Sequence, residues 1–215
     1  MSTPTELPIP DGLLTDFAQR WHELAAGWGR RSATIATIGP AGTSSDVVAG
    51  LLTERYGMRV RLFPTFDAVL AAVLDESADL ALVPSAYRDI TGFHWHPALR
   101  LLSYFQYPTP DYGIVRRAQD PPPLPVTGPI HVASMWEVRR LFAELAPPEL
   151  AGRAVRWRDA DSTQHAARLV AAGACELGIT NTPGVDTNDL CWVARRPGAE
   201  IVWAVFERRR DEEST

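Results

Sequence analysis

The sequence contains no lysine, and all 21 of its basic residues are arginine. This absence excludes a Schiff-base lysine, a pyridoxal phosphate held on the chain, and a phosphate-binding P-loop, since each of these requires a lysine amine. Any carbanion chemistry must therefore proceed without a protein amine as the electron sink. We expect the protein to use no cofactor.

Cysteine is scarce as well, and long apolar runs are missing. Cys175 and Cys191 are the only cysteines and do not form a CxxC pair, so we expect no metal site. No apolar run approaches 18 residues, and the N-terminus lacks the basic and apolar regions of a signal peptide. The net charge is -5, without a basic stripe interleaved with aromatics. These features predict a cytoplasmic protein that binds neither membrane nor nucleic acid.

Short apolar runs alternate with helical patterns along most of the chain. The first helix is expected over residues 13–28, and strand–helix units follow from residue 33, which favours an α/β fold with parallel strands. An irregular aromatic stretch at 84–110 separates two such halves. We therefore predict two lobes with a cleft between them. The expected divisions are an N-terminal extension with one helix at 1–32, lobe one at 33–95 and 188–207, lobe two at 96–187, and a charged tail at 208–215.

The stretch from Gly39 to Asp46, GPAGTSSD, joins the first expected strand to a helix. Such a turn can bind an anion, because the first amide N–H groups of a helix lack partners and the helix dipole is positive there. The alternative is an ordinary capped helix, with Thr43 as the N-cap and Asp46 as its partner three residues later. The other strand ends favour the first interpretation.

Polar residues follow five of the expected strands. In open α/β sheets, ligands bind beyond the carboxyl ends of the strands, so these groups should face one cleft. Neutral donors of this kind suit a small molecule that carries one or two carboxylates. The candidate binding residues are Gly42, Thr43, Ser44, Ser45, Ser85, Ser134, Ser162, Thr163 and Asn181.

Three side chains are candidate proton donors: Tyr87, Tyr112 and His165. Tyrosines more often pack with a satisfied hydroxyl, and His165, on the first turn of a helix, can face either the cleft or solvent. The arginines at Arg139 and Arg140 suggest a solvated face, as do those between residues 153 and 158.

Three blocks of the sequence resemble prephenate dehydratase domains. They are GPAGTSS at 39–45, DLALVP at 79–84, and STQHAARLV at 162–170 followed by GITN at 178–181. Their order and spacing agree over residues 33–206. The resemblance implies a two-lobed, type II periplasmic-binding-protein-like fold with a ligand cleft.

The departures from that family point to one branch of it. Ser85-Ala86-Tyr87-Arg88 stands where dehydratases have Ile-Glu-Asn-Ser, and Ile201 to Phe206 lacks their catalytic Thr-Arg-Phe block. The chain resembles instead the prephenate decarboxylases of bacilysin-type antibiotic pathways, through GPAGTSS, VPSAY at 83–87, TPDYG at 109–113 and Trp203-x-x-Phe206. It departs from them at Ser85, where that family has a histidine.

The resemblance implies decarboxylation of prephenate with retention of the ring hydroxyl, giving a dihydro-4-hydroxyphenylpyruvate for antibiotic biosynthesis. An aromatising dehydratase needs an acid directed at that hydroxyl, and Val202-Trp203 offers none. Trp203, Tyr87 and Tyr112 would form aromatic walls around the substrate. The alternatives are a dehydratase that gives phenylpyruvate and a carboxylate-binding module without catalysis. A homo-oligomer, a dimer, is expected.

Overall fold

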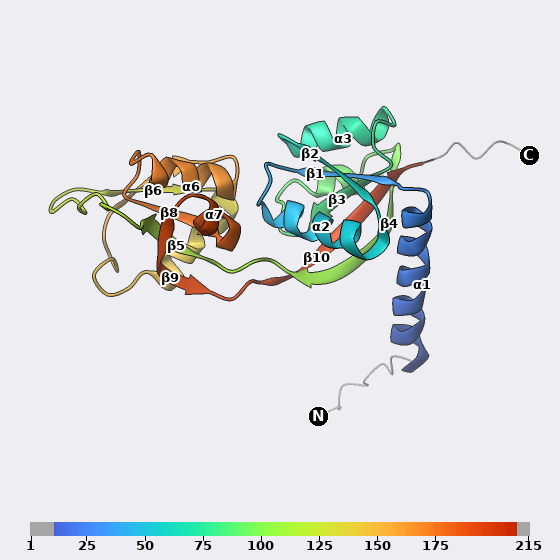
Figure 1. Cartoon of the computed structure of the whole chain (residues 1–215), viewed down its shortest axis with the longest axis horizontal. Coiled ribbons are helices and arrows are strands. Elements are labelled where there is room, and N and C mark those ends of the chain that lie inside the picture. The colour runs from blue at the N-terminus through green and yellow to red at the C-terminus, as the bar shows by residue number, and fades with distance from the viewer. Residues whose placement is uncertain (1–10, 210–215) are drawn as a thin grey trace, which may run out of the picture.

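The computed structural model describes residues 11–209, with side chains from residue 18 onward, and has two lobes joined by two adjacent segments (Figure 1). The residues at 1–10 and 210–215, which hold the start of the expected extension and most of the charged tail, lie outside this range. Within the described residues, no helix is both long and apolar enough to cross a membrane.

Lobe one is built on a five-stranded sheet in the order β2-β1-β3-β10-β4. β1 and β3 are almost wholly buried because helices cover both faces of the sheet. Ile35, Leu80 and Leu82 pack toward α1 and α2, whereas Ala36, Ala81 and Val83 pack toward α3. The elements are α1 (Asp11–Arg30), β1 (Thr34–Ile38), α2 (Ser44–Tyr56), β2 (Arg59–Phe63), α3 (Phe66–Leu74), β3 (Leu80–Pro84), α4 (Thr91–His94), β4 (Leu99–Pro108) and β10 (Glu200–Arg208).

Lobe two repeats this plan with a sheet in the order β7-β6-β8-β5-β9. Helix α6 packs mainly on β8, with Ala166, Ala167 and Val170 in the apolar core. The elements are β5 (Tyr112–Arg117), β6 (Ile130–Ser134), the 3-10 turn η1 (Trp136–Val138), α5 (Arg140–Leu145), β7 (Val155–Asp159), α6 (Thr163–Ala171), β8 (Leu177–Asn181), α7 (Thr182–Thr187) and β9 (Leu190–Arg196).

The α/β class with two lobes is confirmed, but the sheets are mixed rather than parallel. β10 runs antiparallel to both β3 and β4, and β5 runs antiparallel to both β8 and β9. The expected lobe divisions after 95 and before 188 also differ from the structure, because β4 pairs in the first sheet and β9 in the second. The chain passes between the lobes near residues 109 and 199. The short helices α4 and α7 were not expected.

Helix α1 docks on lobe one by aromatic and apolar side chains. Trp28 and Ala25 are buried, and Trp21 contacts Trp28 at 5.5 Å and Phe105 at 4.9 Å between ring centroids. The appended helix expected from its apolar spacing is thus part of the core of lobe one.

The two segments that connect the lobes lie against each other. The amide N–H of Thr109 donates to the carbonyl oxygen of Ala199 at 2.9 Å, and the N–H of Gly198 donates to Asp111 Oδ1 at 3.2 Å. A Cβ atom on Gly198 would lie 1.7 Å from the carbonyl oxygen of Thr109, so only glycine permits this approach. The two connecting segments therefore pass between the lobes as a closely packed, hydrogen-bonded pair.

Candidate active site

A cavity of about 590 Å³ lies between the lobes, at the carboxyl ends of β1, β3, β6 and β7. A hollow of this size suits a small organic molecule. Eight of the residues predicted from the sequence line it: Thr43, Ser44, Ser45, Tyr87, Tyr112, Ser162, Thr163 and Trp203. Hydroxyl side chains that follow β1, β3 and β7 thus share one cavity.

Two predicted serines do not line the cavity, because their hydroxyls are engaged elsewhere. Ser134 is fully buried and its Oγ donates to the carbonyl oxygen of Met135 at 2.7 Å. Ser85 is exposed, and its Oγ accepts from the amide N–H of Val202 at 3.2 Å. Neither serine is therefore among the residues that line the cavity.

Gly42 and Asn181 lie beside the cavity and join the lobes to each other. The carbonyl oxygen of Gly42 accepts from Asn181 Nδ2 at 3.1 Å and from Gln164 Nε2 at 3.3 Å. Gly42 has φ +86°, and a Cβ there would lie 2.4 Å from Gln164 Nε2. Gly42 and Asn181 are not among the residues that line the cavity. The hydrogen bond between them instead holds the 39–46 turn of lobe one against lobe two.

His165, a predicted proton donor, lies outside the main cavity. It lines a separate hollow of about 390 Å³ with Pro40 and Arg168, and its Nδ1 lies 3.3 Å from Asp161 Oδ2. Asp161 and Ser162 line both hollows, so His165 lies next to the main cavity rather than in its wall.

The turn from Gly39 to Asp46 has the geometry of a capped helix. Thr43 Oγ1 accepts from the N–H of Asp46 at 3.3 Å and donates to the carbonyl oxygen of Ile38 at 3.1 Å. Asp46 Oδ2 accepts from the N–H of Gly42 at 2.8 Å. The alternative interpretation of this stretch describes its internal bonding, and Ser44 and Ser45 remain facing the cavity.

Tyr112 and Ser44 meet across the cleft, one from each lobe. Tyr112 Oη and Ser44 Oγ are 2.8 Å apart and share a hydrogen bond. Burial raises the pKa of the Tyr112 phenol, and the carboxylate of Glu137 raises it further, against the opposing effect of the Ser44 bond. The phenol therefore stays protonated at neutral pH.

The raised pKa of Tyr112 predicts a loss of stability in alkaline solution. The folded protein holds this proton more tightly than the unfolded chain, whose phenol titrates near pH 10. The contribution of Tyr112 to the free energy of unfolding should be independent of pH below about pH 10 and should decrease as the pH rises above it. Urea denaturation from pH 8 to pH 11 tests this, and Tyr112→Phe should show a shallower decline. An identical decline in both proteins would contradict the prediction.

An aromatic wall closes the lobe-one side of the cavity. Trp203 is fully buried, and its Nε1 donates to the carbonyl oxygen of Tyr107 at 3.0 Å. Tyr87 packs on Phe66 with ring centroids 4.3 Å apart, and burial raises the pKa of its phenol. Val202 does not line the cavity, since successive side chains of β10 point to opposite faces.

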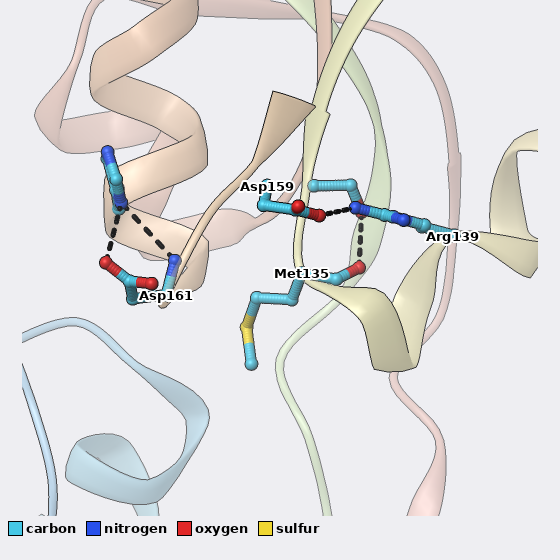
Figure 2. A network of polar contacts seen from close by, with 6 residues as sticks. Met135, Arg139, Asp159 and Asp161 are labelled. Atoms are coloured by element: carbon cyan, nitrogen blue, oxygen red, sulfur yellow. Dashed lines mark hydrogen bonds and ion pairs between the residues drawn. The ribbon is translucent and has the colours of Figure 1, made fainter. Parts of the chain in front are cut away.

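Sequence reasoning missed the contribution of η1 to the cavity. Trp136, Glu137 and Arg139 all line it, although Arg139 was expected on a solvated face. The side chain of Arg139 is 16% exposed and pairs with Asp159 (Figure 2). The sequence does hold one feature that places these residues at the site. They lie within five residues of the end of β6, where a ligand is expected in this class of fold.

Metal binding finds no support in the described part of the chain, where no three His, Cys, Asp or Glu residues cluster suitably. The candidate site is instead a cleft lined by aromatic rings, hydroxyls and two arginines, Arg88 and Arg139.

The fold is that of prephenate dehydratases and related two-lobed domains. The Arthrobacter aurescens prephenate dehydratase in complex with L-Phe superposes with a TM-score of 0.60 at 16% identity, over 85% of this chain and 62% of that one. The chain thus spans about three-fifths of the length of that dehydratase. The Bordetella pertussis BvgS periplasmic VFT2 domain superposes with a TM-score of 0.50 at 17% identity, over 89% of this chain and 84% of that one.

Sequence relatives place the chain more narrowly. A prephenate decarboxylase from Planktothrix agardhii is 30% identical over 189 residues, covering 81% of this chain and 88% of its own. Another, from Bacillus subtilis strain 168, is 27% identical over 80% of this chain and 85% of its own. A scan against protein-family models finds no match. The chain belongs to the prephenate decarboxylase family.

Proposed function

We propose that this protein is a carboxy-lyase that decarboxylates prephenate without aromatising its ring. The observation that carries the proposal is the part of the cavity wall formed by β10, where the buried side chain of Trp203 lies. It agrees with the membership of the chain in the prephenate decarboxylase family. The indole N–H of Trp203 is bonded to Tyr107, so this strand presents ring carbon rather than an acid. The product belongs to antibiotic-type secondary metabolism.

The reaction breaks one carbon–carbon bond and moves one electron pair. The ring carboxylate leaves as CO2, and its bonding electrons enter the cyclohexadiene. A proton added to a ring carbon quenches them, so the hydroxyl stays and the product is the dihydro-4-hydroxyphenylpyruvate. Loss of the hydroxyl would instead require an acid positioned on that oxygen.

The low polarity of the aromatic wall of the cavity favours decarboxylation. A ring carboxylate held against Trp203, Phe66 and Tyr87 loses part of its hydration, which favours departure as neutral CO2. Thr43 lies in the wall but already donates its hydroxyl hydrogen to Ile38, and Ser44 is bonded to Tyr112, so Ser45, Ser162 and Thr163 are the better donors. Candidate acids for ring protonation are Tyr87, Tyr112 and water.

The test is to incubate the purified protein with prephenate and follow CO2 release, phenylpyruvate absorbance and the proton NMR spectrum of the product. We expect CO2 with a non-aromatic keto acid and no phenylpyruvate above the uncatalysed background. Phenylpyruvate as the main product would replace the proposal with dehydratase activity. Binding of prephenate by calorimetry without turnover would indicate a binding module.

We also propose that the protein acts as a homodimer in the cytoplasm. β4 is an edge strand of ten residues that carries Leu101 and Tyr107 partly exposed, at 43% and 38%, and an exposed edge of this kind favours pairing. Light scattering after size-exclusion chromatography should give twice the chain mass. A mass of 23.7 kDa, that of a single chain, would contradict this.

A further inference from the structure

Two helix N-termini face the cleft, α2 from lobe one and α6 from lobe two, and they differ in charge. The first turn of α2 contains Asp46, whose carboxylate accepts from the N–H of Gly42. A fixed negative charge at this position repels a second anion and occupies a donor that the anion would need. The turn at Gly39 to Asp46 is therefore the weaker of the two places for a carboxylate.

The N-terminus of α6 has no acidic residue in its first turn. Ser162 caps it by accepting from the N–H of His165 at 3.0 Å. The next residue, Thr163, lines the cavity and is 2% exposed, yet its Oγ1 has no hydrogen-bond partner within residues 11–209. A buried hydroxyl without a partner is destabilising, and an acceptor on a bound ligand would satisfy it.

Arg139 supplies a positive charge to the same wall. Its guanidinium stacks at 5.2 Å from the rings of both Trp136 and Trp157, which fixes its plane. The Nη2 atom of Arg139 pairs with Asp159, and its Nε atom is buried without a partner among the described residues. A guanidinium has five N–H donors, so this arginine retains capacity for a second carboxylate.

Three carboxylates lie near Arg139, and none of them fully offsets its positive charge. Asp159 and Asp161 have side chains 89% and 91% exposed, so water screens them, and Asp161 also faces His165 (Figure 2). Glu137 lines the cavity and acts on the phenols of Tyr112 and Tyr87 from across it. The local charge therefore favours one anchored carboxylate and disfavours a second one nearby.

We propose that Thr163 and Arg139 form the subsite for the side-chain carboxylate of the substrate, the one that is retained in the product. This assignment rests on the proposed function and fixes the direction in which the substrate lies. A cation beside the departing carboxylate would stabilise the ground state and slow CO2 loss, whereas a cation beside the retained one binds ground state and transition state alike. The ring then lies toward Trp203 and Tyr87 of lobe one, where the other arginine of the cavity, Arg88, is 64% exposed and paired with Asp89.

The test compares substitutions at the subsite with matched controls. Thr163→Val removes the hydroxyl at constant shape and Thr163→Ser keeps it, while Arg139→Gln removes the charge. Arg140→Gln removes the adjacent arginine, whose side chain is 82% exposed and paired with Glu144. We expect T163V and R139Q to raise KM for prephenate about tenfold or more, with kcat changed much less, and T163S and R140Q to stay near wild type.

Binding of phenylpyruvate, measured by calorimetry, separates the subsite from the reaction, because this probe carries the retained side chain but no ring carboxylate. T163V and R139Q should weaken its binding by the same factor as they raise KM. Asp159→Asn frees Arg139 from its pair, so it should leave binding of the probe unchanged or strengthen it. Thermal denaturation confirms that each variant is folded.

The outcomes distinguish the two proposals. Unchanged binding of phenylpyruvate and unchanged KM in folded T163V and R139Q would overturn the subsite while leaving the decarboxylase intact. If the wild-type protein does not consume prephenate, yet binds phenylpyruvate in a manner that depends on Arg139 and Thr163, the proposed reaction fails and the subsite stands. Loss of kcat without change of KM would place these residues in the chemical step and contradict anchoring.

Discussion

Replacement of Trp203 with alanine is expected to lower the free energy of unfolding by about 3–5 kcal/mol, the range typical of a truncated buried aromatic residue. The side chain is fully buried in the core that lobe one shares with α1, beside Ile35 and Leu82. Its removal leaves a cavity and strands the carbonyl oxygen of Tyr107. Urea denaturation at neutral pH measures the loss.

Trp95→Ala provides the control, since Trp95 is 86% exposed. That substitution should change stability by no more than about 0.5 kcal/mol. Trp203→Phe keeps most of the ring and should fall between the two. If W203A were as stable as W95A, Trp203 would not be a core residue, and its place as the wall of the cleft would have to be abandoned.

Replacement of Gly113 with alanine is expected to cost at least about 3 kcal/mol and to abolish turnover. A Cβ atom at this position would lie 2.1 Å from the carbonyl oxygen of Ala194 and 2.7 Å from the Cα of Arg195. Both contacts are backbone atoms of β9, so they can be relieved only by separating β9 from β5. Tyr112, the neighbour of Gly113, would move with the strand and lose its bond to Ser44.

Gly50→Ala is the matched control for this glycine substitution. Gly50 lies inside α2 and a Cβ there meets nothing within 4 Å, so alanine should stabilise the protein by about 0.5–1 kcal/mol. The midpoint of thermal denaturation, followed by circular dichroism, should therefore shift in opposite directions in the two variants. A stable, active G113A would show that the close packing of β5 on β9 is unnecessary.

Local patterning was sufficient to predict the elements of the fold but not the way they combine. Alternation of strands and helices located β1, β2 and β6 with the helices that follow them, because each depends on residues close in sequence. The placement of β4 in one sheet and β9 in the other depends on hydrogen bonds between segments far apart in the sequence, β4 with β10 and β9 with β5. Nothing in the local sequence near residue 95 or residue 188 marks these pairings.

For the site, the sequence predicted where polar groups gather but not which way each one points. Ser45 and Thr163 reach the cavity, whereas Ser134 and Asn181 end similar strands and bond to the protein itself. These outcomes depend on single rotamers and, for Asn181, on an acceptor that lobe one brings from far along the chain. Arg139 was misjudged because a single 3-10 turn, η1, turns it back over the strand ends.

The order of the strands has a consequence for synthesis of the protein on the ribosome. β10 lies between β3 and β4, so β4 has no neighbour in its sheet until residues 200–208 have been made. Lobe two is one continuous segment whose sheet is complete with β9, at residue 196. All strands of the lobe-two sheet are therefore synthesised before β10 is made, and the lobe whose synthesis starts first is the last to be completed.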